Sequence, residues 1–177
     1  KSESEEILYC LTKIKTQKMK LCVVILAKNE AETIADCLDS LSGLNPTEIL
    51  VIDDNSADST AKIAREKGAR VLEYHKKDFA DARNYASRQV KGNWILYIDA
   101  DERVSKELAR EIKTLQPHTA VAAYKLSRLN FYLGKRWPHV EQLTRLIKKS
   151  ALKRWSGEVH ESPIILGKIE SLSNPIY

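Results

Sequence analysis

The chain has 177 residues, of which 43% are hydrophobic and 30% are charged, and its formal net charge is +5. This size and balance are typical of one globular domain with a hydrophobic core, which excludes wholesale disorder. The longest apolar run has seven residues, from Leu21 to Ala27, and a membrane-spanning helix needs roughly 20, so the chain is not expected to span a bilayer.

Residues 1–19 form a polar, amphipathic stretch that ends at the only methionine, Met19. We interpret it either as an appended helix or as sequence upstream of the domain, and we assign no function to it. Its charged first residues do not resemble a secretory signal peptide, so the expected location is the cytoplasm. The domain itself is expected to comprise residues 20–177.

From residue 20 onward, strand and helix patterns alternate. Continuous apolar runs predict strands, and apolar residues at helical spacing predict helices. Ser56 and Ser105 are expected to cap two of the helices, and Gly68 to end one. The expected elements are strand 21–27, helix 31–41, strand 48–52, helix 57–67, strand 70–73, helix 79–90, strand 94–98 and a helix from 105 to about 115.

The three cysteines, Cys10, Cys22 and Cys37, lack the spacing of a metal site. Cys22 falls in the first apolar run, and Cys37 on the apolar face of the first predicted helix. Both are therefore expected to be small core residues of a protein in a reducing compartment.

After Pro117 the pattern changes to two short strand-like runs, 120–126 and 143–148, separated by loops rich in Arg, Trp and Pro. The expected fold class is therefore α/β, with a Rossmann-like first half and a more irregular second half. The aromatic residues of the second half could either stack on the ring of a bound ligand or belong to the core: Phe131, Tyr132, Trp137 and Trp155. Trp137, in an expected loop, is the favoured platform.

The positive charge is concentrated in the C-terminal third. Residues 1–120 contain 19 Lys and Arg against 20 Asp and Glu, whereas residues 121–177 contain 10 against 4. Such an excess is typical of a surface that meets an anionic ligand or membrane, or of a merely solvated face. We expect peripheral contact with an anionic membrane surface, with recognition of an anionic acceptor as the competing explanation, and no nucleic acid partner. The cations concerned are Lys135, Arg136, Lys148, Lys149, Lys153 and Arg154.

Acidic side chains follow three of the predicted strands, in the segments Lys28-Asn29-Glu30, Asp53-Asp54-Asn55-Ser56 and Asp99-Ala100-Asp101-Glu102. The carboxyl ends of parallel strands meet at one edge of a sheet, so these side chains should converge there. Asp and Asn also favour ordinary turns, but three such ends on successive units favour a functional site. Carboxylates this close need a compensating cation, and the hard oxygens of Asp99 and Asp101 suit Mg²⁺ or Mn²⁺.

The six glycines never occur as G-x-G or in a phosphate-binding P-loop. A bound diphosphate would therefore be held by a metal ion and basic side chains.

Four segments, in this order, resemble the nucleotide-binding half of family 2 glycosyltransferases, which have the GT-A fold: ILAKNEAETIADCLDSL, EILVIDDNSADSTAKIA, FADARNYA and WILYIDADERV. Two later stretches, RLNFYLGKRWP and RLIKKSALKRWSGEVHES, resemble the bacterial subgroup typified by lipopolysaccharide-core β-1,4-glucosyltransferases. The resemblance implies a nucleotide-sugar-binding half at 20–104 and an acceptor-side half at 105–177. Many relatives continue beyond SLSNPIY, so acceptor-binding or membrane-contacting helices are expected to be missing here.

The resemblance also implies roles for individual residues. Eight residues are implied to bind the nucleotide sugar: Ala27, Asn29, Glu30, Asp54, Asp81, Arg83, Asn84 and Asp99. Among them, Asp54 would form a hydrogen bond with the uracil, and Asp99 would contact the ribose or the sugar. Asp81, Arg83 and Asn84 would lie near the nucleotide and support the acidic site. Asp101 would bind the metal ion, and Glu158, His160 and Glu161 lie where the family keeps its catalytic acid.

The implied reaction is inverting transfer of a hexose from a UDP-sugar, expected to be UDP-glucose, to a cell-envelope glycan or glycolipid. A metal ion would stabilise the departing diphosphate, and a carboxylate would deprotonate the acceptor hydroxyl. Two alternatives are an inactive nucleotide-sugar-binding module and a receiver-like phosphoacceptor domain. The order of the acids argues against a receiver domain.

Two glutamates compete for the role of base. If residues 159–162 are extended, alternate side chains face opposite sides of the strand. Glu161 then lies on the same face as Val159, and Glu158 on the same face as His160. We predict that Val159 packs inward, so Glu161 would face a partly desolvated cleft and act as the base. His160 would then serve as a metal ligand or diphosphate partner, and Glu158 remains the alternative base.

Overall fold

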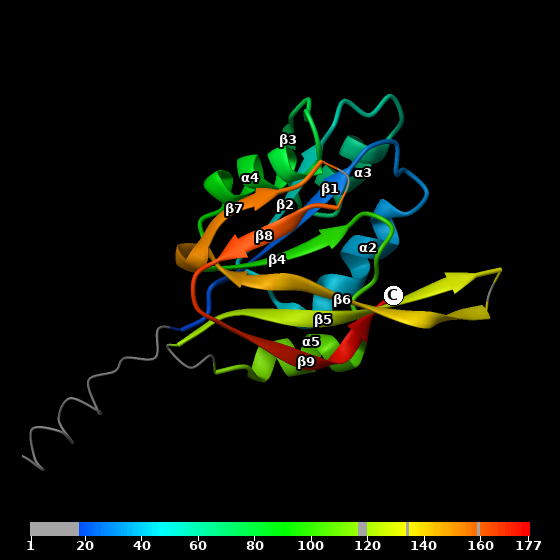
Figure 1. The fold of residues 1–177 in the computed structure, drawn as a ribbon. Coiled ribbons are helices and arrows are strands. Elements are labelled where there is room, and N and C mark those ends of the chain that lie inside the picture. The colour runs from blue at the N-terminus through cyan, green and yellow to red at the C-terminus, as the bar shows by residue number, and fades with distance from the viewer. Residues whose placement is uncertain (1–17, 117–119, 134, 159) are drawn as a thin grey trace, which may run out of the picture.

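The computed structural model describes residues 18–116, 120–133, 135–158 and 160–177. Its main sheet has seven strands in the order β3-β2-β1-β4-β6-β5-β9 (Figure 1). These strands are β1 (Leu21–Ala27), β2 (Glu48–Asp53), β3 (Arg70–Glu73), β4 (Trp94–Asp99), β5 (Val121–Tyr132), β6 (Lys135–Lys148) and β9 (Lys168–Ile176). The first four are mutually parallel, β6 runs antiparallel to β4 and β5, and β9 runs parallel to β5.

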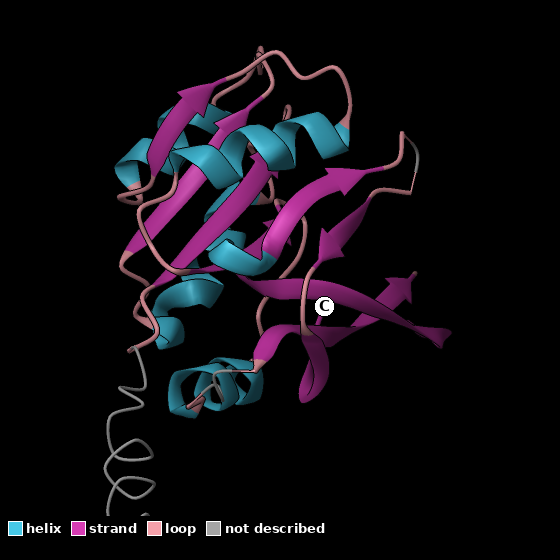
Figure 2. Cartoon of the chain, turned by 60° about the vertical axis from the view of Figure 1, so that its left-hand side comes forward, coloured by secondary structure: helices cyan, strands magenta, loops and turns pink. Residues whose placement is uncertain are grey.

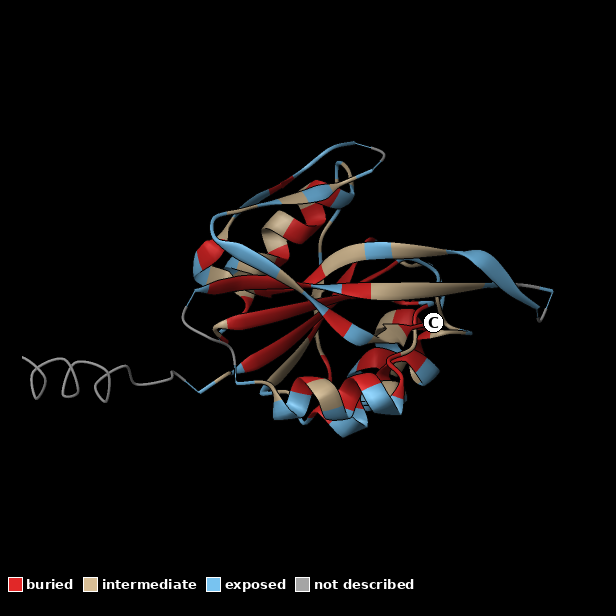
Figure 3. Cartoon of the chain, turned by 60° about the horizontal axis from the view of Figure 1, so that its bottom comes forward, coloured by how far each residue is buried: buried red, intermediate tan, exposed pale blue. Residues whose placement is uncertain are grey.

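Helices lie against the main sheet (Figure 2), and two clusters of buried side chains fill the space between them and the strands. The helices are α2 (Ile34–Ser40), the 3₁₀ turn η1 (Leu41–Leu44), α3 (Thr60–Glu66), α4 (Phe79–Gln89), α5 (Lys106–Thr114) and the 3₁₀ turn η2 (Lys149–Ala151). One core cluster joins the sheet to α2, α3 and α5, and the other joins it to α4 and a small sheet of β7 (Leu152–Ser156) and β8 (Ser162–Ile165). All seven residues of β1 are therefore buried, as Figure 3 shows for the central strands.

The first half confirms most of the predicted elements. The third strand has the predicted bounds, Ser105 Oγ caps α5 by accepting from Leu108 N at 3.0 Å, and Gly68 ends α3 with φ +85°. Cys22 and Cys37 are free and buried, as predicted, whereas Cys10 lies outside the described residues.

Ser56 does not cap α3. Its hydroxyl donates to Asp53 Oδ1 at 2.5 Å, and α3 begins later, at Thr60. The loop is therefore stabilised by the acid that ends β2, because a short polar side chain after a strand satisfies nearby backbone and hydroxyl donors. The first helix also begins later than predicted, at Ile34.

The second half differs more from the prediction. The predicted loop between residues 126 and 143 is a long antiparallel hairpin of β5 and β6, and Trp137 lies on β6. Only residues 146–148 of β6 pair with β4, so the hairpin extends beyond the body of the sheet (Figure 1). Strands β7, β8 and β9 are additional to the prediction. Their polar residues mask the strand pattern because these edge elements bury little on either face.

No helix in the described part of the chain is long and apolar enough to cross a membrane.

Candidate functional site

A pocket of about 400 Å³, which we call the donor pocket, opens at the carboxyl ends of β1, β2 and β4. This is the position where open α/β sheets bind ligands. The predicted residues Ala27, Glu30, Asp54, Asp99 and Asp101 all line it. The convergence expected from the three acidic strand ends is thus present in the structure.

Asp54 is buried in this pocket and is held by two lysines. Its Oδ2 accepts from Lys28 Nζ at 3.0 Å and from Lys76 Nζ at 2.5 Å. Burial disfavours the charged form, but the hydrogen bonds from Lys76 and Lys28 outweigh it and lower the pKa of Asp54 to about 2. The carboxylate is therefore a strong acceptor in a pocket whose cations offset negative charge.

Asn29 and Glu30 connect the loops that form the pocket rim. Asn29 Oδ1 accepts from Ala57 N at 2.7 Å, and Glu30 N donates to Thr60 Oγ1 at 2.7 Å. Glu30 lines the pocket, whereas Asn29, with φ 56°, does not. Asn suits this left-handed conformation better than most residues.

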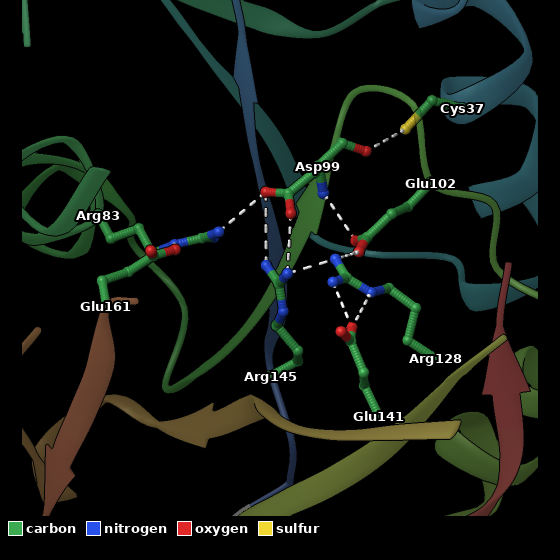
Figure 4. A network of polar contacts seen from close by, with 8 residues as sticks. All are labelled: Cys37, Arg83, Asp99, Glu102, Arg128, Glu141, Arg145 and Glu161. Carbon is green, nitrogen blue, oxygen red and sulfur yellow. Dashed lines mark hydrogen bonds and ion pairs between the residues drawn. The ribbon is translucent and has the colours of Figure 1, made fainter. Parts of the chain in front are cut away.

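A continuous row of ion pairs between acidic and basic side chains runs through the site (Figure 4). Four carboxylates and three guanidinium groups alternate in the order Glu161, Arg83, Asp99, Arg145, Glu102, Arg128 and Glu141. We call these seven residues the charge ladder. They come from α4, β4, the loop after β4, β5, β6 and the segment before β8, so the ladder exists only in the folded chain.

Arg83 and Arg145 hold Asp99 from two sides. Arg83 Nη2 lies 2.8 Å from Asp99 Oδ1, and Arg145 Nη2 lies 2.8 Å from Asp99 Oδ2. Although burial opposes ionisation, the two arginines hold the pKa of Asp99 well below its usual range. Asp99 is thus ionised, with one oxygen held by each arginine, and its partly exposed side chain still lines the pocket.

Arg83 also orients Glu161. Its side chain is 1% exposed, and its Nε donates to Glu161 Oε1 at 3.0 Å. The guanidinium carbon lies 4.9 Å from the ring centroid of Trp155, so the residue is packed as well as paired. Trp155 is a core residue, 4% exposed, and its ring packs against the guanidinium group of Arg83.

Asp101, the residue predicted to bind a metal ion, lies in the lining of the donor pocket. It is exposed, and it makes no hydrogen bond or ion pair with any described residue. Within that part of the chain no group of three or more His, Cys, Asp or Glu side chains could hold a metal ion. The carboxylate of Asp101 fits Mg²⁺ or Mn²⁺ in the binding mode in which the protein supplies one or two carboxylates, and substrate phosphates and water complete the coordination of the ion.

A second cavity of about 830 Å³, which we call the acceptor cleft, adjoins the donor pocket and shares Phe79, Asp99 and Arg128 with it. Glu161 and His160 line this cleft. Glu158 is exposed and is not among the lining residues, and Val159 lies outside the described residues. The structure therefore places Glu161, at 15% side-chain exposure, closer to the shared wall than Glu158.

Two predicted nucleotide ligands lie elsewhere. Asp81 and Asn84 line a separate groove on the outer side of α4. Asn84 exchanges two hydrogen bonds with the backbone of Trp155, at 2.8 and 2.9 Å, and Asp81 Oδ2 accepts from the hydroxyl of Tyr74 at 2.9 Å. In this structure they attach β7 and the loop after β3 to α4, and so support the site from behind.

Sequence reasoning assigned no individual role to several residues of the site: Lys28, Lys76, Glu102, Arg128, Glu141 and Arg145. Lys28 and Glu102 belong to the strand-end segments that the sequence singles out, whereas Lys76 and the residues of the hairpin lie outside them. Arg128, Glu141 and Arg145 lie on the hairpin strands, whose polar spacing carries no local signal of a site.

Comparisons with known proteins agree with this geometry. A family model described as "Glycosyl transferase family 2" matches residues 22–164. An uncharacterized glycosyltransferase of Rickettsia prowazekii (strain Madrid E) is 29% identical over 168 residues, which cover 89% of this chain and 57% of the relative. The chain thus spans little more than half the length of that relative.

Two solved structures have a similar fold. Glucosyl-3-phosphoglycerate synthase from Mycobacterium tuberculosis, in complex with Mn²⁺, UDP and glucosyl-3-phosphoglycerate, gives a TM-score of 0.54 at 24% identity over 63% of this chain and 44% of that one. Mannosyl-3-phosphoglycerate synthase from Rubrobacter xylanophilus gives 0.52 at 26% identity, covering 62% of this chain and 40% of that one.

Proposed function

The chain belongs to glycosyltransferase family 2 and has the GT-A fold, and we propose that it transfers glucose from UDP-glucose to a cell-envelope glycan or glycolipid. A lipopolysaccharide core is the acceptor suggested by the motifs of the second half. One observation carries the proposal: the donor pocket and the acceptor cleft meet at a shared wall of Phe79, Asp99 and Arg128. Two ligands bound there would place a sugar beside an acceptor hydroxyl.

The donor pocket supplies the groups that a uridine nucleotide needs. The ionised carboxylate of Asp54 can accept the ring N–H of uracil, and Lys28 and Lys76 offset the charge of both Asp54 and the nucleotide. Asp99 is held by Arg83 and Arg145, so its oxygens are positioned for hydroxyl groups of the ribose or the sugar. The neighbouring structure with bound UDP and Mn²⁺ is consistent with such a donor.

Asp101 would hold a divalent metal ion together with the diphosphate. A bound ion stabilises the negative charge that develops on the leaving diphosphate. Arg128 lines both cavities, so it adds a fixed positive charge next to the same wall.

Glu161 would remove the proton from the acceptor hydroxyl. Its pairing with Arg83 limits its orientation, and its place in the lining of the acceptor cleft puts it within the space that an acceptor hydroxyl would occupy. Attack from the acceptor side displaces the diphosphate directly, so the sugar is transferred with inversion. His160, at the rim of the cleft, is placed to contact the acceptor or the diphosphate.

The proposed location is the cytoplasm, at the inner face of the cytoplasmic membrane, where nucleotide sugars and envelope glycolipids meet. The mixed sheet and the family match do not fit the receiver-like alternative. The inactive binding module remains the rival that an experiment must separate from an enzyme.

The test is a panel of UDP- and GDP-sugars incubated with the chain, Mn²⁺ and candidate acceptors, with release of the nucleotide diphosphate as the readout. We expect UDP release from UDP-glucose, increased by a lipopolysaccharide-core acceptor. Saturable UDP-glucose binding by calorimetry without UDP release under any of these conditions would instead identify an inactive binding module.

A further inference from the structure

The free end of the β5–β6 hairpin is apolar and exposed. Phe131 is 55% exposed, Leu133 86% and Trp137 50%, although most large apolar side chains of the described chain are buried. The strands around these residues extend past their paired parts with β4 and β9 (Figure 1). The ring of Phe131 lies 6.0 Å from that of Tyr177, centroid to centroid, and Phe131 remains more than half exposed. Large apolar groups gathered on a projection mark an interaction surface.

Cations accompany these apolar side chains. Lys135 and Arg136 are exposed beside them, and no Asp or Glu occurs between Arg128 and Glu141. We call Phe131, Leu133, Lys135, Arg136 and Trp137 the hairpin tip. Aromatic and aliphatic side chains interleaved with Lys and Arg are the combination that enters the interfacial region of an anionic bilayer.

We propose that the hairpin tip inserts into the interface of an anionic membrane and is the membrane-docking element of this protein. Apolar side chains lie on both faces of the hairpin, because Phe131 is cross-strand partner to Arg136 and Trp137 alternates with Arg136 along β6. This distribution suits a hairpin that inserts into the membrane interface with its turn first, so that both of its faces contact lipid. A second copy meeting the same tip symmetrically would bring Lys135 and Arg136 of both copies together, which disfavours a dimer here.

The base of the hairpin connects this surface to the proposed active site. Arg128 on β5 and residues 139–145 on β6 line the acceptor cleft. A docked tip would therefore hold the cleft close to the bilayer, where a glycolipid acceptor resides.

The six cations named from the sequence do not form one surface. Lys135 and Arg136 are at the tip. The other four are at the opposite end of β6, whose position Figure 1 shows: Lys148 ends β6, Lys149 begins η2, and Lys153 and Arg154 lie on β7. A strand of this length spans roughly 40 Å. The exposed apolar neighbours of the second group are aliphatic, not aromatic: Ile164, 40% exposed, is the cross-strand partner of Arg154, and Leu166, 60% exposed, donates its backbone N–H to Ala151 O. Lys149 Nζ already donates to Val90 O at 2.6 Å. This contrast makes the second group a matched control.

The experiment is co-sedimentation of the full chain with vesicles of phosphatidylcholine alone or mixed with phosphatidylglycerol, at low and high salt and without donor. We expect binding only to the anionic vesicles, decreasing with salt. Lys135→Gln with Arg136→Gln should weaken the partition coefficient about 30-fold, and Phe131→Ser with Trp137→Ser about tenfold. The control pair, Lys153→Gln with Arg154→Gln, should retain most of the binding.

Tryptophan emission gives a second readout. Trp94 and Trp155 are 3% and 4% exposed, so a blue shift on adding anionic vesicles reports Trp137 and should vanish in Trp137→Phe. Circular dichroism verifies the fold of each variant. Equal losses in the tip and control charge pairs would overturn the proposal in favour of diffuse attraction, as would absence of vesicle binding. A tip variant that converts a dimer to a monomer in light scattering would show a protein interface instead.

Discussion

At the scale of single residues, Asp101 and Asp99 have different surroundings although they are two positions apart. Asp99 is engaged by Arg83 and Arg145, and Asp101 is exposed in the donor pocket. This difference is the basis for the roles that we propose, positioning of the donor for Asp99 and metal binding for Asp101.

Asp101→Asn is expected to lower metal-stimulated UDP release by about 10²-fold or more, because it removes the anionic ligand and keeps its shape. Stability should change by less than about 0.5 kcal/mol, since an exposed side chain without partners in the described structure is replaced. Steady-state assays over a Mn²⁺ titration and a urea melt check both expectations. Full activity of the variant, or of the unaltered chain in EDTA, would exclude the metal role.

Glu161→Gln is expected to slow transfer by about 10²-fold, the usual scale for a lost general base, while the Kd for UDP-glucose stays nearly unchanged. Glu158→Gln is the matched control, because Glu158 is exposed and does not line the cleft. Single-turnover rates and calorimetric donor binding are the measurements. If the two phenotypes are exchanged, Glu158 is the base and the assignment to Glu161 is wrong.

At the scale of elements, the charge ladder connects helices, strands and loops that are far apart in the sequence. Arg83 connects α4 to the end of β4 and to the segment before β8. Its removal would leave Glu161 without this ion pair and Asp99 with Arg145 as its remaining cation.

Arg83→Met is expected to destabilise the protein by about 3–5 kcal/mol, the usual cost of breaking a buried ion pair from one side. The loss should be smaller at pH 4 than at pH 7, because Arg83 contributes to the lowered pKa of Asp99, and protonation relieves a buried carboxylate that has lost one of its two cations. Arg88→Met, exposed on the same helix, should cost less than about 0.5 kcal/mol. Urea unfolding of both variants at the two pH values is the measurement, and equal losses would show that the ladder adds nothing.

At the scale of the whole molecule, the lowered pKa values of Asp54 and Asp99 make stability depend on pH. A carboxyl group with a lower pKa in the folded state stabilises the fold above its unfolded pKa, and this contribution is lost as the pH falls through the folded pKa. For Asp54, with a folded pKa of about 2, the window lies between about pH 4 and pH 2. Asp99 acts in the same direction.

The unfolding free energy should therefore fall steeply below pH 4, with about 2 kcal/mol of the loss arising from Asp54. Asp54→Asn should be less stable at pH 6 and should lose less on acidification. Urea midpoints at pH 6, 4 and 3 provide the comparison. Parallel pH profiles for the two proteins would contradict the assignment of this titration to Asp54.

The sequence by itself determined the α/β units and the acidic edge. Strands such as 94–98 and helices such as 79–89 follow from the spacing of nearby apolar residues, and parallel strands bring their polar carboxyl ends together wherever they form. Asp54, Asp99 and Asp101 could be named for that reason, and the ordered motifs identified the family that the comparisons confirm.

Only the tertiary structure decided how those acids are neutralised and where the acceptor side lies. Arg145, Arg128 and Glu141 come from hairpin strands that begin far from Asp99 in the chain, and their register depends on backbone pairing with β4 and β9. Polar, protruding strands carry no apolar pattern that predicts such pairing, because their side chains are not sorted by burial. The same reason explains why the charge ladder and the exposed hairpin tip become visible only in the folded molecule.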